Sequence, residues 1–193
     1  MDVIEEWEKI YGQKFMEKIG IKPGDIVIDF GCSIGHYALV LAQTVGSEGF
    51  VFAIDNDEDP LENLKKKINN TELVENIQII HSDKIPDVIG EETVDFVLLY
   101  DVLHFLEPEH RIELYHSIYS VLKSVTGILS IHPKHTKDDD FPVWNFKDMT
   151  TKDVVMEVER LGGFLYERRI DDILWHSEGI MSSSVYNFIK KTK

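Results

Sequence analysis

The chain lacks most of what marks a secreted or nucleic-acid-binding protein. It has a single cysteine, Cys32, in 193 residues. One cysteine excludes an internal disulfide and a four-cysteine zinc site, and it fits a reducing compartment. Basic residues are few, because 20 Lys and Arg stand against 35 Asp and Glu, for a formal charge of −15. Such a surface would repel a phosphate backbone, so no nucleic acid is expected as a partner.

Long hydrophobic runs are also missing. The longest apolar stretch, from Val94 to Leu106, is interrupted by Asp95 and Asp101, and it is shorter than the roughly 20 residues of a membrane-spanning helix. The first ten residues, MDVIEEWEKI, carry acids where a signal peptide carries basic residues. We therefore expect a soluble, cytoplasmic protein that is not exported and has no membrane partner.

Short apolar strands that alternate with helices run through most of the chain. The expected strands are residues 26–30, 50–55, 77–81, 94–100, 126–132, 164–170 and 183–191. The expected helices are an amphipathic N-terminal helix at 2–19, followed by 34–45, 61–69, 109–123 and 150–163. The first five strands are apolar on both faces, as a parallel sheet covered by helices requires, while the last two alternate as antiparallel edge strands do. The pattern predicts one α/β domain, residues 1–193, with a doubly wound, mostly parallel sheet of seven strands.

In such sheets, ligands bind beyond the carboxyl ends of the strands. Polar residues occupy all five of these ends, at 29–35, 55–56, 81–83, 100–104 and 132–135. The first end, Gly31-Cys32-Ser33-Ile34-Gly35, also spells the G-x-S-x-G pattern of a nucleophilic serine. A serine hydrolase using Ser33, with Asp101 and His132 as partners, is one interpretation. It is disfavoured because no earlier strand loop precedes Ser33 to supply an oxyanion donor.

A nucleotide-binding interpretation of the same loop fits better. Of the three glycines in the dinucleotide pattern G-x-G-x-x-G, only Gly31 is in place, whereas Asp55 lies 20 residues beyond Gly35, where an acid accepts hydrogen bonds from a ribose. The position of Asp55 thus matches ribose binding, whereas the glycine pattern matches pyrophosphate binding poorly. The pattern favours a ligand with an adenosine end and no diphosphate.

The loop resembles the first motif of the class I S-adenosylmethionine-dependent methyltransferases, D-x-G-x-G-x-G. In VIDFGCSIG, Asp29, Gly31 and Gly35 are in place and Ser33 replaces the middle glycine. The similarity continues in order and spacing from about Lys22 to Lys193. It implies the Rossmann-like methyltransferase fold of this family, with an antiparallel C-terminal strand pair and an N-terminal helix, and S-adenosylmethionine as cosubstrate.

Three later segments extend the resemblance. VFAID resembles the second motif, which implies that Asp55 holds the ribose hydroxyls, and IIHSD resembles the third, which implies that Asp83 takes the adenine amino group. VDFVLLYDVLHFLEP resembles the fourth, with backbone around Tyr100 facing the methionine end. The implied cofactor-binding residues are Asp29, Gly31, Ser33, Gly35, Asp55, Asn56, Asp83 and Tyr100. The segment VLHFL is similar to the small-molecule branch that includes quinone methyltransferases, which implies a small-molecule acceptor.

The chemistry would need few further groups. Methyl transfer depends mainly on alignment, and a general base is required only if the acceptor loses a proton. The candidates are His132, His104 and His135, with His132 preferred because it lies where the fifth strand meets the site. A metal is not expected, since the spacing of His132 and His135 with Asp101 or Asp138 selects none.

The acceptor side is predicted in three segments. They are the N-terminal helix within residues 1–20, with Trp7 and Tyr11, residues 133–147, with Phe141 and Trp144, and residues 171–182. Aromatic and apolar walls suit a small organic acceptor. The main alternative function is a catalytically silent S-adenosylmethionine-binding module that serves a partner protein.

Overall fold

A computed structural model of the chain describes residues 7–69, 75–176 and 179–191. The chain divides into two compact units. Unit 1 comprises Met1–Asp83 and Ile170–Ser184, and unit 2 comprises Lys84–Arg169 and Val185–Lys193. No helix within the described ranges has both the length and the hydrophobicity to cross a membrane.

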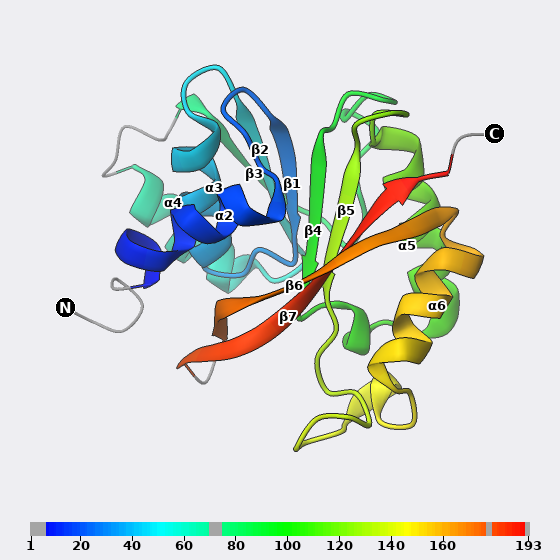
Figure 1. The fold of residues 1–193 in the computed structure, drawn as a ribbon. Helices are drawn as coiled ribbons and strands as arrows, with labels where there is room; N and C mark the ends of the chain where they lie inside the picture. Colours follow the sequence, from blue (N-terminus) through cyan, green and yellow to red (C-terminus); the bar gives the residue numbers. More distant parts are fainter. Residues whose placement is uncertain (1–6, 70–74, 177–178, 192–193) are drawn as a thin grey trace. The chain divides into compact units, whose positions relative to one another are not determined.

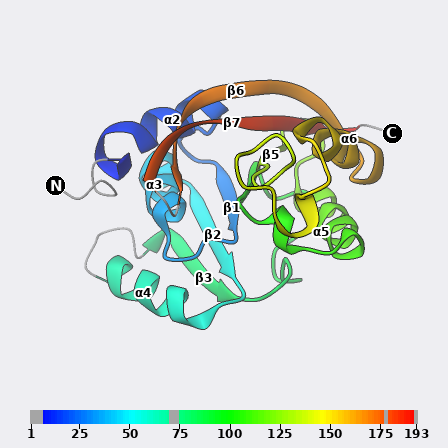
Figure 2. The same cartoon turned by 90° about the horizontal axis from the view of Figure 1, so that it is seen from below.

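Unit 1 is built on three parallel strands. They are β1 (Ile26–Phe30), β2 (Phe50–Asp55) and β3 (Ile77–His81), and their bounds agree with the sequence prediction. Asp29 of β1 pairs with Ala53, and Asp55 of β2 pairs with His81. Helices α3 (His36–Val45) and α4 (Glu58–Ile68) lie on the same face of these strands (Figure 2). The parallel register therefore brings the carboxyl ends of all three strands to one edge of unit 1.

Helix α4 begins three residues earlier than predicted. The Asp57 side chain accepts a hydrogen bond from the backbone N–H of Asp59 and caps the helix. Pro60 lies in the first turn, where a missing N–H is tolerated. The cap therefore decides where the helix starts.

The N-terminal segment of unit 1 is helical in two pieces. A π-helical turn, η1 (Trp7–Gly12), leads into α2 (Gln13–Ile19), whereas one helix was predicted over 2–19. Residues 2–6 lie outside the described residues. Helix α2 ends at Gly20, which has φ of +115°, and the N–H of Gly20 donates to the carbonyl of Glu17. Trp7 is fully buried, and its indole N–H donates to the carbonyl of Ile173.

Unit 2 contains β4 (Phe96–Tyr100) and β5 (Ile128–His132), which pair in parallel. The second half of β7 (Gly179–Lys190) pairs antiparallel with β5, as the sequence predicts for the last strand. The helices are α5 (Pro108–Val121) and α6 (Thr151–Leu161), with Thr150 and Asp153 forming a capping box at α6. Two 3-10 turns, η3 (Leu103–Phe105) and η4 (Trp144–Phe146), follow β4 and β5 along the chain.

The last two strands are longer than predicted. Strand β6 spans Phe164–His176, where 164–170 was expected, and β7 begins at Gly179 rather than at 183. The acidic pair Asp171 and Asp172 directly follows the predicted end of the strand. Both are partnered within unit 1, because the Lys18 ammonium contacts Asp172 at 2.6 Å and the Ser184 hydroxyl donates to Asp171. Tertiary contacts thus allow the strand to continue through residues that sequence alone places in a loop.

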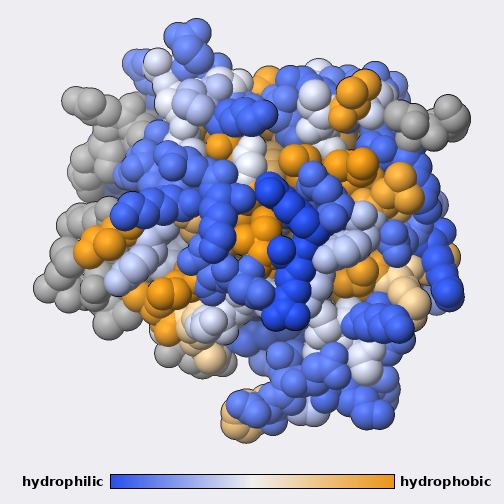
Figure 3. Space-filling model, in the orientation of Figure 1, coloured by the Kyte–Doolittle hydropathy of each residue, from blue (hydrophilic) through white to orange (hydrophobic). Residues whose placement is uncertain are grey.

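The seven strands form one sheet in the order β3-β2-β1-β4-β5-β7-β6 (Figure 1). This order, with parallel strands followed by an antiparallel pair, confirms the predicted fold class. On the face drawn in Figure 3, hydrophilic residues cover most of the surface and hydrophobic residues appear as separate patches.

Candidate functional site

The loop from β1 to α3 turns sharply because three of its residues have left-handed backbone conformations. The φ angle is 81° at Gly31, 49° at Ser33 and 83° at Gly35. Glycine adopts this conformation freely, whereas it costs a residue with a side chain about 1–2 kcal/mol. Ser33 therefore occupies a backbone position suited to glycine, as expected of a substituted glycine.

Gly35 also permits the close approach of α4. A Cβ atom on Gly35 would lie 2.2 Å from Cδ1 of Leu64 and 3.0 Å from its Cγ. The Lys67 ammonium on the same helix donates to the carbonyl of Ile34 at 3.1 Å. Two independent contacts thus pack α4 against the loop and fix its shape.

Asp55, the last residue of β2, organises the loop through its carboxylate. Its Oδ2 accepts the N–H of Ser33 at 2.8 Å, and its Oδ1 accepts the N–H of Asp57 at 2.9 Å. Each carboxylate oxygen has a second lone pair, so both can still accept a hydroxyl from a ligand. The loop itself is tied to β2, because the N–H groups of Gly31 and Cys32 both donate to the carbonyl of Ile54.

Asp29, at the end of β1, is buried and incompletely paired. Its Oδ2 has no hydrogen-bond partner among the residues that the structure describes. Burial and the nearby Asp55 charge raise the pKa of Asp29 to about 7, against a smaller opposing effect of a backbone hydrogen bond from Ala38. Burial also raises the pKa of the Cys32 thiol far above its usual range, so Cys32 is not a nucleophile. Unit 1 therefore holds a carboxyl group that titrates near neutral pH beneath the loop.

Two further predicted residues lie at the same strand ends. The carbonyl of Asn56 accepts a hydrogen bond from the His81 ring at 3.1 Å, and the N–H of Ser82 donates to the carbonyl of Asp55 at 2.8 Å. Asp83 follows Ser82 and is exposed. Unit 1 thus contains seven of the eight predicted cofactor-binding residues, and Tyr100 belongs to unit 2.

The hydrolase interpretation of Ser33 gains no support from this geometry. The recorded hydrogen bond of Ser33 to Asp55 uses the backbone N–H and not the hydroxyl. Among the described residues, no histidine is hydrogen-bonded to the Ser33 hydroxyl. A serine nucleophile requires such a base within about 3 Å.

In unit 2, the ends of β4 and β5 bring an acid and a histidine together. Asp101 Oδ1 lies 2.5 Å from Nδ1 of His132. The Tyr100 hydroxyl forms a buried hydrogen bond of 2.8 Å with Ser130, so its side chain stabilises the interior of unit 2. The predicted role of the backbone around Tyr100 stays a prediction.

His104, the second predicted base, lies in a cluster of aromatic rings. Its ring stacks on Trp144 with a centroid distance of 5.0 Å, and Phe105 and His135 contact it at 4.1 and 4.7 Å. Only 2% of His104 is exposed, and neither ring nitrogen has a hydrogen-bond partner in the described part of the chain. Burial, reinforced by His135, lowers the pKa of His104 to about 4. A base this weak is poorly suited to proton abstraction near pH 7.

The predicted acceptor-side segments differ in exposure. Trp7 packs against Phe15 and Tyr37 and is fully buried, so it is a core residue and not an open wall. In residues 133–147, Trp144 is 50% exposed and Phe141 is 76% exposed. Most of residues 171–182 belongs to β6 and β7, and residues 177–178 lie outside the described residues.

Two interactions at this level were not predicted from the sequence. The His36 ring, at the first turn of α3, is 2.8 Å from a carboxylate oxygen of Glu8 and packs on Trp175. The second is the Asp101–His132 pair, whose two members had been considered together only as a catalytic triad fragment or as metal ligands. No local sequence pattern indicates either pair, because Glu8 and His36 are 28 residues apart and Asp101 and His132 are 31 residues apart.

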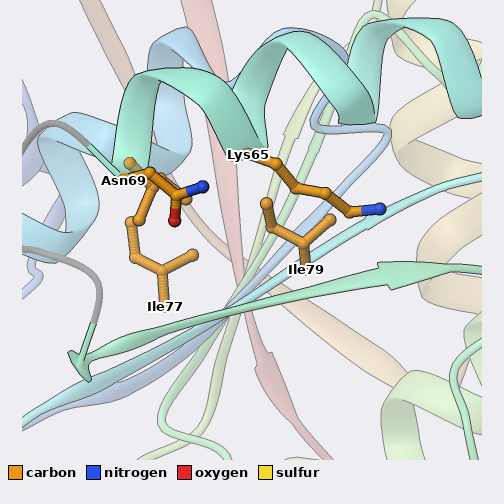
Figure 4. Close-up of a pocket in the computed structure, with 5 residues that line it drawn as sticks. Lys65, Asn69, Ile77 and Ile79 are labelled. Carbon is orange, nitrogen blue, oxygen red and sulfur yellow. The ribbon is translucent and has the colours of Figure 1, made fainter.

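A surface hollow of unit 1 lies away from these strand ends. Lys65 and Ile68 of α4 and its C-cap residue Asn69 line one hollow together with Ile77 and Ile79 of β3 (Figure 4). It adjoins the beginning and middle of β3, whereas Asp83 follows the end of that strand. Within the described ranges, no group of three or more His, Cys, Asp or Glu side chains could hold a metal ion.

The fold is Rossmann-like, and sequence comparison gives the family of the chain. The profile of the methyltransferase domain family matches residues 27–125, about half of the chain, so the chain belongs to this family. It is 31% identical over 121 residues to a carboxy-S-adenosyl-L-methionine synthase from Vibrio atlanticus, covering 62% of this chain and 49% of that protein. It is 30% identical over 94 residues to a demethylmenaquinone methyltransferase from Staphylococcus aureus, covering 49% and 38%. The chain thus spans half or less of these relatives.

Solved structures agree in fold. A SAM-dependent methyltransferase from Aquifex aeolicus superposes with a TM-score of 0.72 at 24% identity, over 95% of this chain and 92% of that one. A SAM-dependent O-methyltransferase from Thermotoga maritima gives 0.64 at 18% identity, over 100% and 72%. The resemblance to class I S-adenosylmethionine-dependent methyltransferases is confirmed in family and fold.

Proposed function

We propose that the protein transfers a methyl group from S-adenosylmethionine to a small-molecule acceptor. The observation that carries the proposal is the Asp55 carboxylate, which is fixed by two backbone N–H groups at the edge of the Gly31–Gly35 loop. Both oxygens retain capacity to accept the hydroxyls of a ribose. Family membership supports the same activity.

The residues present fit this cosubstrate. When bound, S-adenosylmethionine supplies an activated methyl group on a positively charged sulfur. The unpartnered Oδ2 of Asp29 and the nearby Asp55 make the site acidic, which favours a cationic ligand. The side chain at position 33 is small and leaves the loop open, while Asn56 and Asp83 extend the polar edge for the nucleoside. The role of the backbone around Tyr100 stays a prediction.

Of the two base candidates, His132 fits better than His104. The His132 ring is hydrogen-bonded to the Asp101 carboxylate, which can hold the ring in one orientation toward an acceptor. Among the described residues, His104 has no hydrogen-bond partner, and burial lowers its pKa to about 4. We therefore assign proton acceptance to His132.

The acceptor class is proposed from composition and from relatives. The net charge of −15 disfavours a nucleic-acid substrate. The names of two relatives denote synthesis of carboxy-S-adenosyl-L-methionine and methylation of demethylmenaquinone, which are small molecules. We propose a cytoplasmic enzyme whose residues 1–193 act as one methyltransferase domain, with residues 133–147 and 171–182 on the acceptor side.

Calorimetry with S-adenosylhomocysteine tests the binding half of the proposal. Asp55→Asn should weaken binding by about 10- to 100-fold, because hydrogen bonds to a charged group contribute about 1.5–3 kcal/mol. Asp57→Asn is the matched control, since it removes a neighbouring charge yet leaves an oxygen to cap α4. Equal affinities of the Asp55 variant and the control would refute the ribose assignment.

Product formation separates an enzyme from a silent binding module. Methylated product from a panel of small acceptors, detected by mass spectrometry with labelled methyl groups, would establish catalysis. Binding of S-adenosylhomocysteine with no turnover across that panel would favour the module.

A further inference from the structure

Asp101 has a backbone conformation that its neighbours in β4 do not share. It directly follows the strand, and its φ is 57°, in the left-handed region. Asp and Asn enter this region more readily than other residues with side chains, yet glycine would fit it without strain. Strained residues of this kind concentrate at functional sites. An interaction of the carboxylate should therefore explain why Asp, and not Gly, stands at position 101.

The register of β4 and β5 supplies that reason. Tyr100 pairs with His132, so the residue after Tyr100 lies at the end of the ladder beside the histidine. The Asp101 N–H faces the carbonyl of His132 at 3.4 Å, and its Oδ1 reaches Nδ1 of the same residue at 2.5 Å. The left-handed turn thus directs the carboxylate back to the last residue of the neighbouring strand.

The environment of the two side chains strengthens the contact. The His132 side chain is 7% exposed and the Asp101 side chain 30% exposed, so the bond is screened from water on the histidine side. The Tyr100 ring lies edge-on to the imidazole, with 6.3 Å between the ring centroids. A carboxylate accepts hydrogen bonds, so Nδ1 must carry the proton, and the lone pair of the neutral ring is then on Nε2.

We infer that Asp101 is a positioning residue that holds His132 in the Nδ1–H tautomer and leaves Nε2 as the proton acceptor in methyl transfer. The inference rests on the proposed function. In the step, the acceptor O–H, N–H or C–H bond breaks and its proton passes to Nε2, while the electron pair left on the acceptor bonds to the methyl carbon. The electron pair of the breaking carbon–sulfur bond remains on sulfur, which becomes a neutral thioether. The Asp101 carboxylate stabilises the imidazolium until the proton leaves to water.

The tautomer can be measured without knowing the acceptor. In nitrogen-15 NMR spectra of the full chain above pH 8, we expect the His132 ring to be protonated at Nδ1 and unprotonated at Nε2, with assignment through His132→Gln. Asp101→Asn should reverse the pattern, because its amide N–H₂ donates to Nδ1 and drives the proton to Nε2. Asn also tolerates the left-handed backbone, so the turn should be retained.

Two further variants distinguish the effect of the Asp101 carboxylate on the His132 tautomer from the effect of backbone strain. Asp101→Gly relieves the strain and should also lose the Nδ1–H tautomer. Asp138→Asn alters a carboxylate that accepts the N–H of Thr151, and it should leave the His132 signals unchanged. An Nε2–H ring in the wild-type protein, or an Nδ1–H ring that persists in Asp101→Asn, would overturn the inference.

Calorimetry on the same samples distinguishes this inference from the proposed function. Binding of S-adenosylhomocysteine should change less than twofold in Asp101→Asn, because asparagine tolerates the left-handed backbone and so keeps the turn after Tyr100. Failure of the wild-type protein to bind S-adenosylhomocysteine would refute the proposed function, whichever tautomer is found. The expected tautomer pattern together with intact binding supports both.

Discussion

The two units hold their acidic groups in different ways. In unit 1, the Asp55 carboxylate is fixed by backbone N–H groups of residues 33 and 57. In unit 2, the Asp101 carboxylate is fixed by a side chain, the His132 ring. Backbone donors keep a carboxylate available to bind a ligand, whereas a histidine partner turns a carboxylate into part of a proton-transfer pair. The first arrangement suits a binding site and the second suits a catalytic one.

The binding arrangement in unit 1 depends on the shape of the Gly31–Gly35 loop. Of the substitutions considered, Gly35→Ala should disturb this loop most. The new Cβ would meet Leu64 at 2.2 Å in a left-handed conformation, so we expect a loss of about 2–5 kcal/mol in unfolding free energy. Gly24→Ala is the matched control. Its φ is 86° but nothing lies within 4 Å, so only about 1–2 kcal/mol should be lost in urea unfolding. Equal losses would show that the contact with α4 is unimportant.

Asp29→Asn should change how the stability of the protein depends on pH. The folded pKa of about 7 lies above the ordinary 3.8, so the folded state keeps a proton that the unfolded state releases. Wild-type stability should therefore fall as pH rises from about 4 to about 7, by as much as roughly 4 kcal/mol. Asp29→Asn should lack this loss, so its stability relative to wild type should increase between about pH 4 and pH 7 in thermal unfolding.

Asp153→Asn provides a control of opposite sign. Hydrogen bonds from Thr150 lower the pKa of Asp153, so its stabilisation is present above its ordinary pKa and lost in acid. The variant should therefore lose most relative to wild type at neutral pH. A flat pH difference for Asp29→Asn would contradict the raised pKa.

In unit 2, His104→Phe tests whether the second histidine is only a buried ring. The folded pKa of about 4 lies below the ordinary 6.5, so the unfolded state binds a proton that the folded state rejects. Wild-type stability should fall as pH decreases from about 6.5 to about 4, by roughly 2–3 kcal/mol, and the variant should be spared. Thermal unfolding at pH 5 and pH 8 measures the difference. If His104→Phe were more destabilised relative to wild type at pH 5 than at pH 8, His104 would have a partner in its charged form.

The contacts around Asp55 are easier to anticipate from the sequence than those around Asp101, for a physical reason. Asp55 is the end of a strand, and its donors lie in turns whose glycines are visible in the sequence. The Asp101–His132 pair depends on how β4 and β5 align, and no local pattern encodes that register. The same limit explains β6, whose acidic residues 171 and 172 pair with Lys18 and Ser184 and so continue a strand that appeared to end.

Ser33→Gly is the smallest expected change and addresses the residue that departs from the family pattern. Glycine removes the cost of a left-handed φ of 49° but adds freedom to the unfolded chain, so the net gain in unfolding free energy should be about 0.5–1 kcal/mol. The N–H that donates to Asp55 remains, so S-adenosylhomocysteine affinity should be unchanged in calorimetry. Ser33→Ala keeps the strain and removes the hydroxyl, and it should match wild type in both measurements. Loss of affinity in both variants would instead mean that the Ser33 hydroxyl binds the ligand, and that the substitution of glycine adds a contact to the site.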